Sequence, residues 1–325
     1  MTWPGSPVSG VSPYPETPVY VDPAILEVLL SPLAQIAAFI WGLLWGSFCN
    51  VLIWRIPRGE RVGWDRSRCG SCDAQIAWYD NIPLLSYLLL RGRCRRCKAK
   101  FSARYLVVEI VGGVLSFALY MMHVVVPLMA GGGTVGLFAW QLWFLFSMAL
   151  VVITYVDLDA WIIPDEVVLP VGVVGLLVAA IRPAWLGVSL VEAAAAGLTG
   201  WALVAGLRWL YLKTRGIEAL GLGDGKLLFM IGAFTGPFGL VWTLGAGALQ
   251  GLLVSIPTLA FGGQIANTEL EDIHGDDPQL GEEDPDDGVM GRRVPFGPFL
   301  ALAAFELVLL RPQLDRLFSW ILYGY

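Results

Sequence analysis

Long apolar runs are the feature of this 325-residue chain that most limits its fold. A helix needs about 20 mostly apolar residues to cross the hydrocarbon core of a bilayer. Only 15% of the residues are charged and 56% are apolar, whereas soluble domains average about 25% charged residues. The sequence therefore predicts an all-α polytopic membrane protein. The runs lie near residues 32–54, 105–130, 135–156, 166–181, 186–211 and 227–262, with a shorter one at 294–310.

The run at 227–262 is too long for a single span. It contains the stretch GAFTGPFG at 232–239, a Gly/Pro break that can turn the chain. We therefore expect two helices there and about eight transmembrane helices in all. Residues 1–31 contain no Lys or Arg, so the basic start of a cleavable signal peptide is not visible, and the first span is expected to anchor the chain.

The distribution of basic residues predicts the orientation of the spans. Twelve of the 21 Lys and Arg residues fall in 55–104. Because basic loops stay on the cytoplasmic side of a membrane, this segment is expected to be cytoplasmic and the amino terminus external. Counting eight spans from there places 157–165, 212–226 and 263–293 on the cytoplasmic face as well.

Four cysteines form two CxxC pairs, Cys69 with Cys72 and Cys94 with Cys97, separated by 21 residues. Each pair presents two thiolates at the spacing that tetrahedral zinc requires. A reducing cytoplasm argues against disulfides, and a short Arg-rich segment buries so little core that a metal would supply folding energy. The pattern predicts a small zinc-ribbon-like tetracysteine domain, with a redox dithiol pair as the alternative. Cys49, inside the first span, is expected to be a packed thiol.

Residues 263–293 carry ten of the 27 acidic residues. This composition is typical of a solvated loop, and attraction of a basic partner is the alternative. The predicted division of the chain is an external segment at 1–31, the first transmembrane helix at 32–54, the tetracysteine domain at 55–104, a transmembrane core with the candidate active site at 105–262, the acidic cytoplasmic loop at 263–293, and the last transmembrane helix with an external tail at 294–325.

Asp157 and Asp224 are the leading candidates for catalysis. An acid held within the membrane costs about 2.5–3.5 kcal/mol, which favours a functional reason for it. Asp157 follows the apolar stretch MALVVITYV, and Asp224 ends the sequence GLGD. If the two carboxylates meet, they share a proton, so one can take a proton from water while the other polarises a carbonyl, as in aspartic proteases. A helix-end structural role remains the alternative for each acid.

The histidines of the chain exclude other catalytic sites, and residues around Asp224 suggest a substrate groove. The chain has only two histidines, His123 and His274, so neither a Ser/His pair nor an HExxH zinc site can be assembled. Gly221 and Gly223 are expected to leave room beside Asp224 for an extended substrate. Lys226 is interpreted either as part of that groove or as a cytoplasmic anchor.

Five sequence blocks stand out along the chain: GSFCNVLIWRIP (46–57), CGSC with WYDNIPLLSYLLLRGRCRRCKAKFSARYLVVE (within 69–109), YVDLDAWIIPD (155–165), EALGLGDGKLL (218–228) and VPFGPFLALAA (294–304). In this order they resemble the blocks of the type IV prepilin peptidase family, the GxGD intramembrane aspartic proteases of type IV pilus and type II secretion systems. The resemblance spans about residues 42–310 and places the catalytic roles on Asp157 and Asp224. Gly70 stands where the family often has Pro, and Ala160 where many members have His.

The resemblance implies an enzyme with two steps at the cytoplasmic face of the bacterial inner membrane. It would remove the short basic leader of a prepilin or pseudopilin after a glycine, and then methylate the new amino terminus with S-adenosylmethionine. The second step rests on the family and its tetracysteine domain, because 55–104 carries no glycine fingerprint of a Rossmann-type cofactor site. Glu109 and Asn50 are candidates for the transferase or substrate groove, or for bonds across helices. The expected partners are the prepilins and the lipid bilayer, with no nucleic acid.

Two functions of other classes compete with this prediction. A proton-coupled transporter would use Asp157 and Asp224 as carriage sites near the middle of the membrane, but the sequence places both acids at span ends. A zinc-bearing scaffold of a secretion system would need no acid pair.

Overall fold

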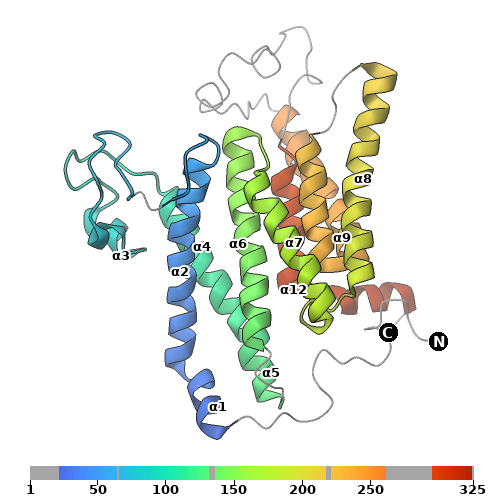
Figure 1. The fold of residues 1–325 in the computed structure, drawn as a ribbon, viewed down its shortest axis with the longest axis horizontal. Helices are drawn as coiled ribbons and strands as arrows, with labels where there is room; N and C mark the ends of the chain where they lie inside the picture. The colour runs from blue at the N-terminus through green and yellow to red at the C-terminus, as the bar shows by residue number, and fades with distance from the viewer. Residues whose placement is uncertain (1–21, 64–65, 132–135, 217–220, 261–294, 324–325) are drawn as a thin grey trace. The chain divides into compact units, whose positions relative to one another are not determined.

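The computed structural model describes a chain that is almost entirely helical, with isolated β-bridges at Arg68–Gln75 and Arg93–Lys100 within the described residues (Figure 1). This confirms the predicted all-α class. The chain divides into two compact units, which we call the amino-terminal unit (up to residue 152) and the carboxy-terminal unit (from residue 153). The described residues are 22–63, 66–131, 136–216, 221–260 and 295–323.

Within the described residues, six helices are long and apolar enough to cross a membrane. Two features account for the difference between these six helices and the eight spans expected. Helix α7 (Asp165–Ile181) has 17 residues and is too short to be included, and α9 (Leu222–Ala260) is one helix of 39 residues across a kink. The six are Pro32–Arg55, Arg104–Met129, Gly136–Ala160, Leu190–Arg215, Leu222–Pro257 and Gly297–Leu314.

The amino-terminal unit begins with two capped helices. Asp22 and Ser31 each accept a hydrogen bond from a backbone N–H in the first turn, and a proline follows each cap, as helix starts favour. The elements of this unit are α1 (Pro23–Leu30), α2 (Pro32–Arg55), η1 (Trp78–Asn81), α3 (Leu85–Leu90), α4 (Arg104–Tyr120), the π-helix η2 (Met121–Val125), α5 (Val126–Met129) and most of α6 (Gly136–Ala160).

Helices α2 and α4 cross at glycines. A Cβ on Gly46 would lie 2.7 Å from the Cα of Glu109, and one on Gly112 would lie 2.5 Å from the carbonyl oxygen of Gly42. Small residues let membrane helices approach backbone to backbone, where packing rather than the hydrophobic effect holds them together. The hydroxyl of Ser116 also donates a 2.6 Å hydrogen bond to the Ala38 carbonyl. These contacts fix the depth of α4 relative to α2.

The carboxy-terminal unit is built around the kinked helix α9. Gly236 has φ 68° and ψ −165°, and Pro237 follows it, so the predicted break in GAFTGPFG is confirmed. The break divides α9 into arms at 222–235 and 237–260. The remaining elements are the end of α6, α7, the short η3 (Pro183–Trp185), α8 (Leu190–Arg215) and α12 (Gly297–Tyr323).

The two arms of α9 pack on different partners. In the first arm, a Cβ on Gly232 would lie 2.7 Å from the backbone nitrogen of Gly197 in α8. In the second arm, Trp242 Nε1 and Gln250 Nε2 donate hydrogen bonds of 3.1 and 2.7 Å to the carboxylate of Glu306 in α12. A Cβ on Gly247 would also lie 3.1 Å from Leu300 near the start of α12. The second arm therefore holds the start of α12 in place.

Both chain ends contain helix where the sequence indicated none. The expected tail after the apolar run at 294–310 contains helix, because α12 continues through Pro312 to Tyr323. The expected external segment 1–31 includes α1 at Pro23–Leu30. The rest of 1–21 and the predicted acidic loop at 263–293 lie outside the described residues.

We expect Gly112→Ala to destabilise the protein by about 1–3 kcal/mol, because the added methyl group would collide with the backbone of α2. The measurement is the thermal unfolding midpoint of the purified protein in detergent. Gly206→Ala in α8 is the matched control, since a Cβ there would meet nothing within 4 Å. Equal midpoints for the two variants would contradict the backbone contact between α2 and α4.

Candidate functional site

Asp157 and Asp224 both lie in the carboxy-terminal unit, at the ends of helices. Asp157 is in the last turn of α6, three residues before Ala160, and Asp224 is the third residue of α9. The Asp157 side chain is buried, with 6% of the residue exposed, and Asp224 is partly buried. The two carboxylates are close enough for the charge of Asp224 to act on Asp157. The structure thus brings together two acids that are 67 positions apart in the sequence.

The start of α12 forms one wall around Asp157. A Cβ on Gly297 would collide with Asp157 Oδ2, and the Gly297 backbone N–H acts on the same carboxylate. An N–H at a helix amino terminus stabilises negative charge. Among the described residues, the buried Asp157 Oδ2 and the indole nitrogen of Trp161 have no hydrogen-bond partner. The Asp157 oxygen is therefore available as an acceptor for a bound group.

The turn after α6 determines whether Gly221 and Gly223 have free space beside them. Trp161 has φ 54° and donates its backbone N–H to the Asp157 carbonyl at 3.0 Å, which ends α6. The chain then places Ile163 so that a Cβ on Gly223 would lie 3.0 Å from the Cβ of Ile163. Gly223 therefore permits a close approach of Ile163. Gly221 is exposed, and a Cβ on it would meet only the backbone nitrogen of Gly223, at 3.9 Å.

Lys226 forms an ion pair that sequence reasoning missed. Its Nζ lies 2.6 and 2.8 Å from the two carboxylate oxygens of Asp165. The pair joins the first turn of α9 to the first turn of α7, so it braces the two helix starts beside Asp224. Opposite charges at two predicted helix starts are the only sequence signal for this contact, and they do not identify the partner.

The four predicted metal ligands form a compact cluster in the amino-terminal unit. All four Sγ atoms lie within 4.8 Å of one another, and none is in a disulfide. The Sγ atoms of Cys69 and Cys97, one from each CxxC pair, are 3.8 Å apart. Four sulfurs at these separations fit a single tetrahedral ion such as zinc, which thiolates bind at about 2.3 Å.

The two CxxC turns are built alike. In the first turn, the Cys69 N–H donates a hydrogen bond to the Ala74 carbonyl at 3.0 Å, and the Cys69 carbonyl accepts one from the Asp73 N–H at 2.8 Å. In the second turn, the Cys94 N–H donates to the Ala99 carbonyl at 2.8 Å, and the Lys98 N–H donates to the Cys94 carbonyl at 3.1 Å. Asp73 and Lys98 have positive φ, 51° and 61°, at the matching position. The structure therefore contains two copies of one knuckle facing each other.

The environment of the sulfurs favours thiolates held by a cation. The backbone N–H groups of Cys97 and Arg96 donate to the sulfur of Cys94 and lower its pKa to about 6. The N–H of Ala99 acts in the same direction on Cys97, but desolvation and the neighbouring thiols outweigh it and raise the pKa of Cys97 to about 11. Four adjacent thiols ionise together only when a positive ion compensates their charge. Cys49 is separate from this cluster and buried in α2, which agrees with a packed thiol.

Asn50 and Glu109 lie in the amino-terminal unit and make contacts that hold it together. Asn50 Nδ2 donates a 3.0 Å hydrogen bond to the Tyr105 carbonyl, which joins α2 to α4. Glu109 Oε2 accepts a 2.7 Å hydrogen bond from the Leu84 N–H, which joins α4 to the residue before α3. These bonds are of the kind expected from the structural interpretation, while a transferase role for either residue stays a prediction.

Comparison with known proteins identifies both halves of the chain. Residues 40–123 match a family described as Bacterial Peptidase A24 N-terminal domain, and residues 143–256 match one described as the Type IV leader peptidase family. A protein of Myxococcus xanthus is 32% identical over 88% of this chain and 92% of its own length. Proteins of Stutzerimonas stutzeri and Aeromonas hydrophila are each 31% identical, over 89% and 86% of this chain and 96% and 91% of their own lengths. All three are named prepilin leader peptidase/N-methyltransferase. No solved structure matches the chain.

We expect the purified full-length protein to carry one metal ion per chain, measured by elemental mass spectrometry. Cys72→Ser should lose that ion and lower the thermal unfolding midpoint, because three sulfurs no longer close the tetrahedral site. Cys49→Ser is the control, since its thiol is outside the cluster and should leave the metal content unchanged. Full metal content in the Cys72→Ser protein would contradict a four-thiolate site.

Proposed function

This chain belongs to the type IV leader peptidase family, and from that premise we propose that it cleaves the basic leader of type IV prepilins or pseudopilins and methylates the new amino terminus. The observation that carries the peptidase assignment is the convergence of Asp157 and Asp224 at the end of α6 and the start of α9. The chain covers nearly the whole length of relatives that are named for both activities. It is a multi-pass inner-membrane enzyme.

We propose that Asp157 and Asp224 act as one catalytic pair with a shared proton. The ionised member removes a proton from a water molecule, whose oxygen attacks the scissile carbonyl, and the protonated member donates its hydrogen bond to the carbonyl oxygen. The tetrahedral intermediate then breaks its C–N bond as the leaving amine takes up a proton from the pair. The unpartnered Oδ2 of Asp157 supports this role, because it is buried and can receive that proton.

A substrate segment must be extended for its backbone to be attacked. We propose that it passes Gly221, where the chain leaves open space, and that Gly223 serves instead to bring Asp224 close to the end of α6 through Ile163. The ion pair between Lys226 and Asp165 keeps these helix starts together, so Lys226 acts as a positioning residue of the groove.

The methyl-transfer step requires a donor, and we propose S-adenosylmethionine from the names of the relatives. The four-cysteine cluster fits a structural zinc ion, with Cys69, Cys72, Cys94 and Cys97 as its ligands and no open coordination position for chemistry. The zinc would hold the two knuckles together. Glu109 ties the cysteine domain to α4 through its bond to Leu84, and Asn50 joins the flanking helices α2 and α4 through its bond to Tyr105.

The basic residues between α2 and α4 support an orientation with the amino terminus outside and the active site at the cytoplasmic face. A prepilin has its basic leader ahead of an apolar helix, so the bond to be cut lies at the level of the head groups. Asp157 and Asp224 lie at helix ends, which suits that depth.

The same depth weighs against a proton-coupled transporter. Carriage sites lie near the middle of a membrane, at broken helices, whereas the break in α9 at Gly236 is twelve residues away from Asp224. A secretion scaffold would give no reason to bury two interacting carboxylates. Neither alternative is favoured by the names of the relatives.

We expect Asp157→Asn and Asp224→Asn each to reduce prepilin cleavage by at least about a thousandfold, because neither can share the proton that the pair needs. The assay follows leader release from a purified prepilin by gel mobility and mass spectrometry. Asp159→Asn, two residues further along α6, is the matched control and should keep cleavage within a few-fold. Wild-type rates in either pair variant would refute the catalytic assignment.

We expect Cys72→Ser to retain or weaken cleavage while abolishing methylation, since the cysteine cluster lies in the unit that does not contain the acid pair. Mass spectrometry of the product amino terminus distinguishes the two steps, because methylation adds one methyl group. A fully methylated product from this variant would show that transfer does not need the tetracysteine domain.

A further inference from the structure

Helix α3 exposes its apolar side chains and buries its polar one. Leu85, Leu88 and Leu89, which we call the leucine face, are 49%, 58% and 72% exposed. Ser86 points inward, is 9% exposed, and donates its hydroxyl to the Tyr79 carbonyl at 3.1 Å. A helix that faces water has the opposite arrangement, with apolar residues toward the core. The leucine face therefore requires an apolar covering.

Two aromatic side chains extend this surface. Trp78 and Tyr79 of η1 are 75% and 50% exposed, with ring centroids 5.7 Å apart. The segment is held rigidly, because Arg95 donates hydrogen bonds of 2.7 and 2.6 Å to the carboxylate of Asp80 and thereby lowers the pKa of that acid. Trp and Tyr are enriched at the interface between hydrocarbon and water, where one part of the ring system is apolar and another polar.

The depth of α3 is fixed by its own unit. The N–H of Leu84, directly before α3, is bonded to Glu109 of α4, and the backbone of Glu109 lies against Gly46 of α2. Gly46 is nine residues before the end of α2 at Arg55, or about 13 Å along the helix axis at 1.5 Å per residue. Figure 1 accordingly shows α3 beside the α2–α4 pair and below the upper end of α2. The residue before the leucine face is therefore tied to the α2–α4 pair at a point about 13 Å inside the end of α2, beside the span itself.

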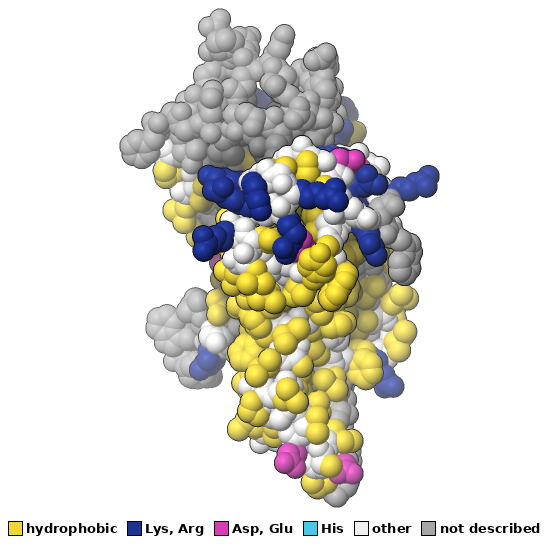
Figure 2. Space-filling view, turned by 90° about the vertical axis from the view of Figure 1, so that its left-hand side faces the viewer, with side chains coloured by type: hydrophobic (Ala, Val, Ile, Leu, Met, Phe, Trp, Pro, Cys, Tyr) yellow, Lys and Arg dark blue, Asp and Glu magenta, His cyan; other side chains and the backbone are white. Residues whose placement is uncertain are grey.

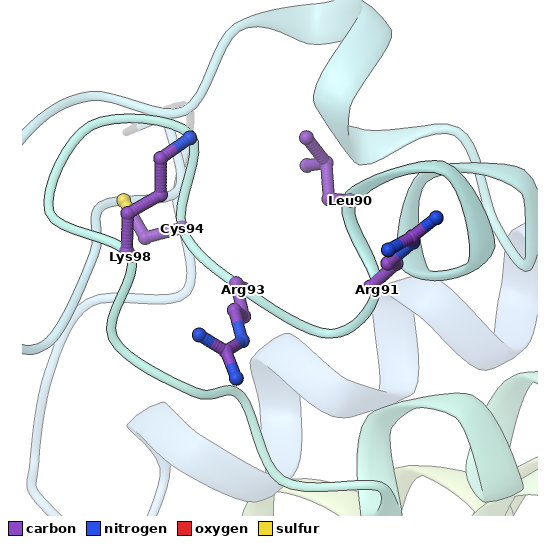
Figure 3. Close-up of a pocket in the computed structure, with 5 residues that line it drawn as sticks. All are labelled: Leu90, Arg91, Arg93, Cys94 and Lys98. Carbon is purple, nitrogen blue, oxygen red and sulfur yellow. The ribbon is translucent and has the colours of Figure 1, made fainter.

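Cations surround this apolar surface. A cavity of about 470 Å³ follows the end of α3 and is lined by Leu90, Arg91, Arg93, Cys94 and Lys98 (Figure 3). Arg91, Arg93 and Lys98 are all exposed. Figure 2 shows the same arrangement on a larger scale: Lys and Arg side chains form a band across the upper part of this face, and apolar side chains cover the surface directly below.

We propose that α3 and η1 dock on the bilayer that the chain itself spans, with the leucine face at the boundary of the acyl chains and with Arg91, Arg93 and Lys98 among anionic phospholipid head groups. Arg and Lys bind phosphate through charge-assisted hydrogen bonds, and each basic residue near an anionic membrane adds to the attraction. An acidic protein would neutralise the cations and leave the leucines exposed to water. A phospholipid satisfies both groups of residues, because its acyl chains can cover the leucine face while its phosphate contacts the neighbouring cations.

Photo-crosslinking tests the position of the leucine face in an otherwise unchanged protein. The photoreactive residue p-benzoylphenylalanine replaces Leu89, and the full-length chain is placed in nanodiscs that contain phosphatidylglycerol and phosphatidylcholine. Illumination should give an adduct with the mass of a phospholipid. The same residue in place of Val62, an exposed apolar position of the cytoplasmic segment, is the control and should give none. A crosslink from position 89 to protein, such as the acidic segment 263–293, or no adduct at all, would overturn the proposal.

Native mass spectrometry tests the phosphate site. We expect the triple variant Arg91→Gln, Arg93→Gln, Lys98→Gln to lose one bound phosphatidylglycerol and to show at least a tenfold weaker preference for it over phosphatidylcholine. The control variant Arg208→Gln, Lys213→Gln, Arg215→Gln removes the same charge from the end of α8 and should keep that lipid. Titration with inorganic phosphate should not displace it. Equal losses in both variants would reduce the site to general attraction by positive charge and refute it.

Discussion

The burial of a carboxylate at the end of a membrane helix is the constraint on which the carboxy-terminal unit depends. An isolated ionised acid in such a place is costly, so the surrounding backbone has to supply polar partners. Here the Gly297 N–H at the start of α12 faces Asp157, and only glycine leaves room for that approach. The position of α12 depends in turn on the bonds from Trp242 and Gln250 to Glu306. A contact in the second arm of α9 thus determines the environment of Asp157 in α6.

The sequence was most informative where a constraint acts over neighbouring residues. The membrane requires each span to be long and apolar, so most helix bounds agree with the apolar runs to within a few residues. The break at Gly236 followed from adjacent glycine and proline, and the cysteine cluster from the spacing within each CxxC pair. The apolar run at 294–310 is shorter than helix α12, which continues through Pro312 to Tyr323, because a helix can extend beyond the apolar stretch that identifies it.

Contacts between distant segments were not predictable from the sequence, and they change the roles that we assign to several residues. Two glycines before Asp224 looked equivalent, but the turn after α6 brings Ile163 against Gly223 and leaves Gly221 open. Lys226 was interpreted as part of the groove or as an anchor, and the structure shows it paired with Asp165 at 2.6 Å. Glu109 was one of several polar residues near a span end, and only the fold shows that it holds the Leu84 backbone. Each of these depends on helix packing, which local patterns do not encode.

The depth of the tetracysteine domain bears on how one chain can perform two steps. After cleavage, the new amine remains attached to an apolar helix in the bilayer, so it cannot move far from the head groups. Methyl transfer must therefore take place at that depth, whichever residues bind the donor. The bond between Leu84 and Glu109 ties α3 to the span α4, and the exposed leucines of α3 resist a position in water. Fully burying a leucine side chain contributes about 1.5–3 kcal/mol, and covering the exposed parts of these three contributes a fraction of that each. A domain held in this way stays at the bilayer, whereas one attached only through its chain ends would be free to move away from it.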